Sequence, residues 1–272
     1  MVNDSKLAFI GAGKMVSAMV SSLLRLGSFK PEDLICCSAN DGTSERLSKA
    51  TGILRANSIP ELLAFEPDVL TLGCKPQQLA EIASVFSDKK VESIVLSIMA
   101  GITLGRLSDS FPDAQNVIRS MPNTPGQIGE GITGFVFLNS PNQLEYQIVT
   151  NILSSLGESF ELNSEEDIDR ITAISGSGPA YLFEFTCALE CAAKEIGLPE
   201  KLANKFALQT ITGSSKLLEN TDLHPEELRS QVTSPNGTTQ AALESLEKNN
   251  LRKIVLDAVE AAKARSIELS NA

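Results

Sequence analysis

The chain has 272 residues, of which 42% are hydrophobic and 21% charged, and its formal net charge is −11. This balance is typical of a folded globular protein, and the length favours two domains over one. The acidic excess argues against nucleic acid and membrane surfaces as partners, because both attract basic patches. No apolar run of about 18 residues predicts a membrane-spanning helix, and residues 1–13 lack a secretory pattern. We therefore expect a cytoplasmic protein.

Short apolar runs alternate with amphipathic segments through the first half of the chain. The runs predicted as buried strands are Leu7–Ile10, Leu34–Cys37, Val69–Leu72, Ile94–Ile98 and Val117–Ile118. Helices are predicted between them, at Met15–Leu26, Thr43–Thr51 and Gln77–Phe86. Gly134–Leu138 and Phe160–Leu162 are candidates for later strands at the sheet edge. This alternation predicts an α/β fold with a doubly wound, mainly parallel sheet, as in Rossmann-like domains.

The strand pattern stops after residue 164, and helical patterns fill the rest of the chain. The predicted helices are Glu165–Gly197, Pro199–Glu219, Pro225–Val232, Thr239–Lys248 and Leu251–Leu269. We therefore expect a dinucleotide-binding domain at 1–164 and an all-helical domain at 165–272. The stretch Tyr181–Ala193 is apolar on most sides, so it needs cover from its own domain or from another subunit. The helical domain is accordingly a candidate for dimerisation.

The residues that follow the first predicted strand form a glycine turn, which reads Gly11-Ala12-Gly13, and Lys14 and Met15 then begin a helix. Gly11 permits a tight turn, and Gly13 lets the backbone approach a pyrophosphate at the helix start. Val16 occupies the third position of the GxGxxG pattern, where Gly or Ala is usual. The alternative is a plain strand-to-helix turn, but the position after the first strand favours dinucleotide binding.

The residues after the second predicted strand bear on which dinucleotide is bound. An NAD site normally carries Asp or Glu there to bind the ribose 2′-hydroxyl. Here Ser38 and Asn40 follow the strand, and Asp41 comes later in an apparent turn. The missing carboxylate leaves room for a 2′-phosphate, to which Ser38 and Asn40 can donate hydrogen bonds, whereas Arg46 is expected to be solvated. We predict NADP(H) as the preferred cofactor, with NAD(H) as an alternative.

A second candidate site lies at residues 232–247, which read VTSPNGTTQAALESLE. A Ser-Pro turn leads through Asn236 and Gly237 into a predicted helix. The backbone N–H groups at a helix start are unpaired, and the helix dipole favours an anion there. The hydroxyls of Ser234, Thr238 and Thr239 could bind a ligand, or they could simply cap the helix.

Neither the cysteines nor the histidine predicts a metal or a nucleophile. No paired CxxC motif or histidine cluster accompanies the five cysteines, so we expect no metal site and reduced thiols. His224 is the only histidine, and no nucleophile motif is available to partner it. We expect His224, which precedes Pro225, to be structural.

Several motifs together resemble the pyrroline-5-carboxylate reductase family. They are Asn236-Gly237 with Thr239 and Ala242, SGSGPAY at Ser175–Tyr181, MPNTP at Met121–Pro125, Gly73–Pro76 and Met99–Gly101. The resemblance implies reduction of 1-pyrroline-5-carboxylate to L-proline, the last step of proline synthesis, with a hydride from NAD(P)H. It also implies cofactor contacts from Asn57, Cys74, Lys75, Pro76, Met99, Ala100, Gly101 and Asn123.

The resemblance further implies how the substrate is held. Ser234 and the N–H groups of Gly237, Thr238 and Thr239 would grip the carboxylate. Thr239 would hydrogen-bond the ring nitrogen and is the predicted catalytic residue, through orientation more than proton transfer. The family's helical domains interlock as homodimers, with the site at the interface, and some relatives form larger rings of dimers. Relatives often carry Glu just before the His-Pro pair, where this chain reads Asp222-Leu223-His224-Pro225, and this departure puts a substrate contact from that segment in doubt.

Two other functions are compatible with parts of the sequence. An NADP-dependent β-hydroxyacid dehydrogenase has a similar domain arrangement, but it needs a lysine beside the Gly-rich motif. Here no lysine follows Gly178 until Lys194. A catalytically silent NADP-binding sensor or dimerisation module is disfavoured by the intact Ser234–Thr239 loop.

Overall fold

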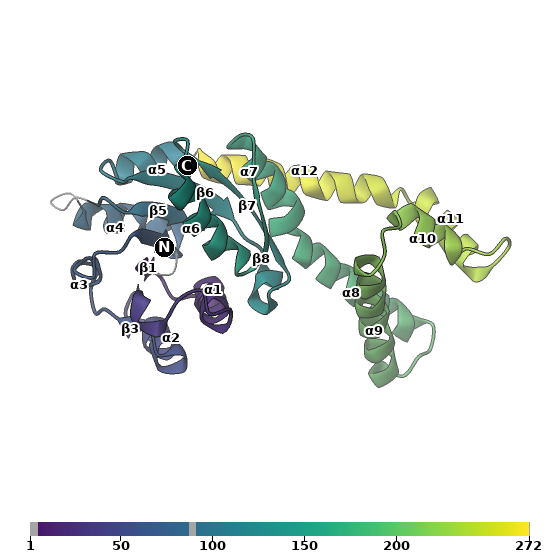
Figure 1. The fold of residues 1–272 in the computed structure, drawn as a ribbon. Helices are drawn as coiled ribbons and strands as arrows, with labels where there is room; N and C mark the ends of the chain where they lie inside the picture. Colours follow the sequence, from purple (N-terminus) through teal and green to yellow (C-terminus); the bar gives the residue numbers. More distant parts are fainter. Residues whose placement is uncertain (1–4, 87–90, 272) are drawn as a thin grey trace. The chain divides into compact units, whose positions relative to one another are not determined.

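The computed structural model describes residues 5–86 and 91–271 and is shown in Figure 1. The chain forms two compact units. Unit 1 comprises Met1–Ser177 and Ala262–Ala272, and unit 2 comprises Gly178–Ala261. In the described ranges, no helix has the length and apolarity needed to cross a bilayer.

Unit 1 is built on a mixed, mainly parallel sheet with the order β3-β2-β1-β4-β5-β6-β7-β8. Its strands are β1 Leu7–Ile10, β2 Leu34–Cys37, β3 Leu54–Arg55, β4 Val69–Leu72, β5 Ile94–Ser97, β6 Asn116–Met121, β7 Gly131–Phe137 and β8 Gly157–Glu161. Every neighbouring pair is parallel except β6 with β7. The predicted α/β class is confirmed.

Helices cover both faces of this sheet, as Figure 1 shows. The α-helices of unit 1 before Ser177 are α1 Lys14–Arg25, α2 Thr43–Thr51, α3 Ile59–Leu63, α4 Leu79–Val85, α5 Leu104–Ser110, α6 Gln143–Ser154 and α7 Glu166–Ile171. Short 3-10 helices are η2 Pro31–Asp33, η3 Pro76–Gln78 and η4 Thr124–Ile128, and a π-helical segment, η5, spans Thr172–Gly176.

Successive residues of the central strands enter different apolar cores. Phe9 packs in one core with Met19 of α1, whereas its neighbour Ala8 lies in the other core with Leu62 of α3. Side chains alternate across a strand, so a strand covered on both faces is apolar at most of its positions. This explains why β1 reads as the uninterrupted run LAFI.

Polar residues and glycines account for the elements that differ from the sequence prediction. Strand β6 continues beyond the predicted Val117–Ile118 through Arg119 and Ser120, which are both buried. The predicted helix Glu165–Gly197 is divided by the π-helical segment before α8 begins. A Cβ at Gly176 would lie 2.9 Å from the Met121 Cε atom, so the glycine permits close packing there.

Unit 2 consists of α8 Gly178–Glu195, α9 Glu200–Glu219, α10 Pro225–Gln231, α11 Thr238–Lys248 and the first part of α12 Leu251–Ser270. Helices α8 and α9 form a hairpin in which Asn204 Nδ2 donates to Glu190 Oε2 at 2.9 Å. No residue of α8 is buried in the single chain, although this helix contains the apolar stretch predicted to need cover.

The two compact units divide later than the domain boundary that the sequence predicts after residue 164. Ile168 and Ile171 of α7 pack in the core of unit 1, so this helix stays with the sheet. The end of α12, from Ala262 onward, also belongs to unit 1. A helix pattern alone does not show on which core a helix packs.

Candidate functional site

A cavity of about 540 Å³ lies at the carboxyl ends of β1, β2 and β4. Such positions are where open α/β sheets bind ligands. The predicted cofactor residues that line it are Gly11, Ala12, Gly13, Ser38, Asn57, Cys74 and Lys75. Among the lining residues that the sequence did not single out are Asp41, Thr43, Ser58, Ile59, Gln78 and Glu81.

Gly11 closes the base of this cavity through its backbone. Its φ is +98°, and a Cβ there would lie 2.6 Å from the carbonyl carbon of Gly73. Its N–H donates to the Cys37 carbonyl at 2.8 Å. The turn after β1 therefore packs directly against the turn after β4, which leaves no space for a side chain.

Gly13 leaves the start of α1 uncovered. A Cβ at this position would meet nothing within 4 Å. Gly13 is the N-cap of α1, and its own lack of a side chain means that it provides no side-chain cap for the first turn. Uncapped N–H groups beside open space suit the pyrophosphate of a dinucleotide. The residues at this end of the cavity therefore fit the predicted cofactor.

Asp41 joins Ser38 and Thr43 at the end of the cavity that follows β2. Its Oδ1 atom accepts from the Thr43 hydroxyl at 2.6 Å, the Thr43 N–H at 2.9 Å and the Ser38 hydroxyl at 3.2 Å. The Thr43 hydrogen bonds, and then that of Ser38, lower the pKa of the Asp41 carboxyl. A carboxylate therefore lines this end of the cavity, and it comes from the turn after β2 and not from the end of the strand.

The other residues singled out after β2 lie in different surroundings. Asn40 is exposed and does not line the cavity. Arg46 is exposed on α2, as expected, and its Nη1 would lie 3.1 Å from a Cβ at Gly42. Lys14 and Arg46 both line a neighbouring open groove between α1 and α2.

Cys74 and Lys75 line the cavity after β4. Cys74 Sγ lies 3.5 Å from Met99 Sδ, and burial raises the pKa of the Cys74 thiol to about 11. The Lys75 N–H donates to Gln78 Oε1 at 3.0 Å. Asn57 also lines the cavity and donates through its N–H and its side chain to Glu61 Oε2 at 2.8 and 3.2 Å.

Other predicted cofactor residues lie outside this cavity lining. They are Lys14, Met15, Asn40, Pro76, Met99, Ala100, Gly101 and Asn123. Gly101 packs against α12, because a Cβ there would be 2.9 Å from the Leu269 Cβ. Asn123 Oδ1 accepts from the Ile132 N–H at 3.0 Å and so supports the start of β7. Cofactor contacts from these residues stay predictions.

The loop Ser234–Thr239 lies in unit 2 at the start of α11. Gly237 is the N-cap, and no side chain caps the helix, so the Ser and Thr hydroxyls do not serve as an ordinary cap. Asn236 has a φ of +58°, and its N–H donates to Gln240 Oε1 at 2.8 Å. The Gly237 N–H donates to the Ser234 carbonyl at 3.0 Å. The Gly237 N–H is therefore used within the turn. The N–H groups of Thr238 and Thr239 remain as candidate donors to a ligand.

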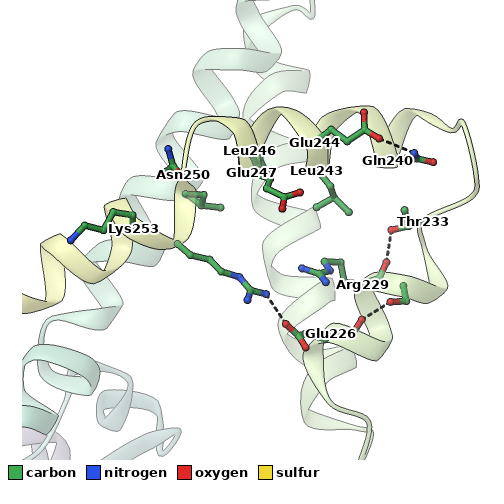
Figure 2. Close-up of a pocket in the computed structure, with 13 residues that line it drawn as sticks. Glu226, Arg229, Thr233, Gln240, Leu243, Glu244, Leu246, Glu247, Asn250 and Lys253 are labelled. Atoms are coloured by element: carbon green, nitrogen blue, oxygen red, sulfur yellow. Dashed lines mark hydrogen bonds and ion pairs between the residues drawn. The ribbon is translucent and has the colours of Figure 1, made fainter.

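A hollow of about 910 Å³ lies between α10, α11 and the start of α12, and is shown in Figure 2. Charged residues of both signs line it, and Arg252 pairs with Glu226 at 2.6 Å. Gln240 also lines the hollow and donates to Glu244 Oε1 at 2.7 Å. None of the predicted substrate residues is part of this lining, so we do not assign the hollow to the substrate.

The described residues contain no group of three His, Cys, Asp or Glu side chains placed to hold a metal ion. His224 is the N-cap of α10, and its Nδ1 atom accepts from the Glu226 N–H at 3.3 Å. This contact gives His224 a structural role, as the sequence suggests.

Comparisons with known proteins match both parts of the chain. Residues 165–269 match the family model for pyrroline-5-carboxylate reductase dimerisation, which supports homo-oligomerisation. Residues 6–101 match the model described as NADP oxidoreductase, coenzyme F420-dependent, in agreement with the predicted NADP(H) cofactor.

Relatives match over nearly their whole length. A pyrroline-5-carboxylate reductase of Synechocystis is 36% identical over 97% of this chain and 98% of its own length. The Pseudomonas aeruginosa enzyme is 34% identical over 99% of this chain and 98% of its own length.

Solved structures agree with this assignment. The reductase of Coxiella burnetii has a TM-score of 0.88 at 30% identity, covering 98% of this chain and 99% of that chain. The Plasmodium falciparum reductase, solved with NADP bound, has a TM-score of 0.85 at 30% identity and the same coverage. The chain therefore belongs to the pyrroline-5-carboxylate reductase family.

Proposed function

We propose that this protein reduces 1-pyrroline-5-carboxylate to L-proline by hydride transfer, with NADPH as the preferred donor and NADH as an alternative. The observation that carries the proposal is the uncapped start of α11, which is flanked by the hydroxyls of Ser234, Thr238 and Thr239. An uncapped helix start attracts an anion, and the substrate offers one carboxylate.

The cofactor is held by unit 1. Gly11, Ala12 and Gly13 would bind its pyrophosphate, and Ser38 and Thr43 lie where the adenosine ribose follows. When bound, NADPH supplies the hydride. The lining thiol of Cys74 stays neutral near pH 7, because its pKa is raised to about 11 by burial, so it adds no negative charge beside the dinucleotide.

The substrate is held by the loop of unit 2. Ser234 and the N–H groups of Thr238 and Thr239 would bind the carboxylate, and the Thr239 hydroxyl would orient the ring nitrogen. The hydride adds to the ring carbon of the C=N bond while the nitrogen carries a proton, which gives the secondary amine of proline. A protonated imine is already electrophilic, so the residues need mainly to orient it and exclude water.

The first test is cofactor oxidation with 1-pyrroline-5-carboxylate, using NADPH and NADH in turn and identifying proline as the product. We expect rapid oxidation with NADPH and a slower reaction with NADH. Intact NADPH binding without oxidation would instead favour a catalytically silent NADP-binding sensor. Turnover of a β-hydroxyacid in place of the imine would favour the dehydrogenase.

Thr239 is tested by removing its hydroxyl at nearly constant volume. We expect Thr239→Val to lower kcat/KM for the imine at least about tenfold, because orientation of the ring is lost. Thr239→Ser should recover most of the activity, and the Kd of NADPH should be unchanged in both. An equal loss of cofactor affinity and turnover would contradict the proposed role.

We further infer a homodimer in which a second copy covers the apolar surface of unit 2. Phe183, Ile196 and Phe206 are 62%, 82% and 60% exposed in the single chain. Surfaces of this kind on a soluble chain mark interaction sites. A larger ring of dimers and a cytoplasmic location remain predictions.

A further inference from the structure

We propose that Asp41 limits the preference for NADPH over NADH, because its carboxylate competes with a 2′-phosphate for the same hydrogen-bond donors. This inference rests on the proposed use of a nicotinamide dinucleotide. It concerns the end of the cofactor cavity that is lined by Ser38, Asp41 and Thr43.

The hydrogen bonds around Asp41 support the competition. The Thr43 N–H and hydroxyl both donate to Asp41 Oδ1, at 2.9 and 2.6 Å. Thr43 is the first residue of α2, so its N–H points from a helix start. The same two donors would suit a phosphate oxygen. The Asp41 carboxylate therefore already uses the two Thr43 donors that a 2′-phosphate would need.

Ser38 is oriented by the same network. Its hydroxyl oxygen accepts from the Ser44 N–H at 3.1 Å, so its proton is directed elsewhere. Asp41 Oδ1 lies 3.2 Å and the Ala39 carbonyl 3.0 Å from that hydroxyl. A phosphate bound by Ser38 would have to displace one of these acceptors.

The charge of Asp41 acts in the same direction. Hydrogen bonds from Thr43 and then Ser38 lower its pKa, so the carboxyl is ionised near pH 7. A 2′-phosphate placed beside it meets a like charge, whereas the 2′-hydroxyl of NADH can donate to a carboxylate. The Arg46 guanidinium lies close to Gly42, but its side chain is exposed and does not line the cavity.

The turn explains how a residue beyond the strand end reaches the cavity. The Asp41 N–H donates to the Ala39 carbonyl at 2.7 Å, and Gly42 has a φ of +72°. The tight turn directs the chain back into α2 at Thr43. Asn40, one residue earlier, does not line the cavity and is not expected to discriminate between the cofactors.

The test uses two fragments that differ only by the phosphate, 2′,5′-ADP and 5′-AMP, titrated calorimetrically into the full-length cofactor-free protein. We expect Asp41→Asn to raise the affinity for 2′,5′-ADP relative to 5′-AMP about tenfold, because a like charge is removed. The ratio of kcat/KM for NADPH to that for NADH should rise by a similar factor.

Glu45→Gln is the matched control, since Glu45 carries the same charge on α2 but pairs with Lys49 at 2.8 Å outside the cavity. Its affinity ratio should change less than about twofold, because Glu45 does not line the cavity and its carboxylate pairs with Lys49. Asp41→Ser keeps an oxygen that can accept from the Thr43 N–H, and it should reproduce the gain if the amide variant is unstable.

If the wild-type protein binds both fragments but the ratio of their affinities is unchanged in both Asp41 variants, the inference is overturned and the proposed function stays intact. Equal gains in Glu45→Gln would also overturn it, because the effect would then be one of overall charge. A wild-type protein that binds neither fragment would overturn the proposed cofactor as well.

Discussion

Gly11 and Gly13 are two residues apart in one turn, yet they lack a side chain for different reasons. Gly11 has a positive φ, and the backbone of Gly73 fills the space that a Cβ would need. Gly13 has a φ of −71°, which any residue can adopt, and it faces open space. Gly11 therefore serves the fold, whereas neither the backbone conformation nor the packing of Gly13 requires a glycine.

The two glycines should respond differently to alanine. We expect Gly13→Ala to raise the Kd of NADPH at least about tenfold by keeping the pyrophosphate off the helix start. Its cost in unfolding free energy should stay below about 1 kcal/mol. Gly11→Ala should lower that free energy by about 2 kcal/mol or more, since it adds backbone strain and a clash.

Calorimetric NADPH binding and urea denaturation measure these two effects. Gly105→Ala is the control, because a Cβ at Gly105 in α5 would meet only the Thr103 hydroxyl at 4.0 Å. It should alter neither quantity by much. Normal NADPH affinity in Gly13→Ala would show that the open face of Gly13 does not receive the cofactor.

At the level of elements, Arg119 on β6 joins α7 to the end of α12. Its guanidinium pairs with Glu165 at 2.9 Å and Asp169 at 3.1 Å, and donates to the Ser270 hydroxyl at 3.2 Å. The Arg119 side chain is only 3% exposed. Ser266 also donates to Asp169 at 2.7 Å. The C-terminal segment is thus held on unit 1 by a buried charge cluster.

Removal of this arginine leaves Asp169, which is 13% exposed, without its cationic partner. We expect Arg119→Ala to lower the unfolding free energy of unit 1 by about 3 kcal/mol. Amide hydrogen exchange at 262–271 should accelerate at the same time. Arg170→Ala is the control, because Arg170 pairs with Glu166 and Asp167 at 53% exposure and should cost less than about 1 kcal/mol. Similar losses in the two variants would contradict the cluster's role.

At the level of the whole molecule, the apolar surface of unit 2 is the part that a single chain leaves incomplete. Ala203 and Ala207 of α9 are buried, but the larger Phe206 between them is 60% exposed. Burying an aromatic side chain of this size contributes about 1.5–3 kcal/mol. A second copy of the chain supplies the cover in the proposed dimer.

A charge in this surface should separate the copies. We expect Phe206→Glu to shift the protein from dimer to monomer in analytical ultracentrifugation and to abolish turnover of the imine. NADPH affinity should persist, because its proposed contacts lie in unit 1. Leu26→Glu is the control, since Leu26 is 56% exposed but belongs to unit 1. A Phe206→Glu protein that remains dimeric would show that this residue lies outside the interface.

The sequence alone determined the centre of the sheet and one side of the cofactor cavity. Strands β1, β2 and β4 begin and end at the predicted residues, because strands covered on both faces are apolar runs bounded by turn residues. The predicted glycine turn follows β1 and lines the cavity with Gly11, Ala12 and Gly13, while its cofactor contacts stay predictions.

Tertiary structure decided the features that depend on distant contacts. Arg119 is charged but belongs to a buried strand, because Glu165 and Asp169 pair with its guanidinium. The Ser270 hydroxyl, 151 residues away, also accepts a hydrogen bond from it. Asp41 follows β2 and lines a cavity together with residues that follow β1 and β4, and only the assembled sheet brings these segments together. Gly101 packs against Leu269, 168 residues further along the chain, while its predicted cofactor contact stays a prediction. Local patterns specify strands and turns, but a partner remote in sequence is chosen only when the whole chain packs.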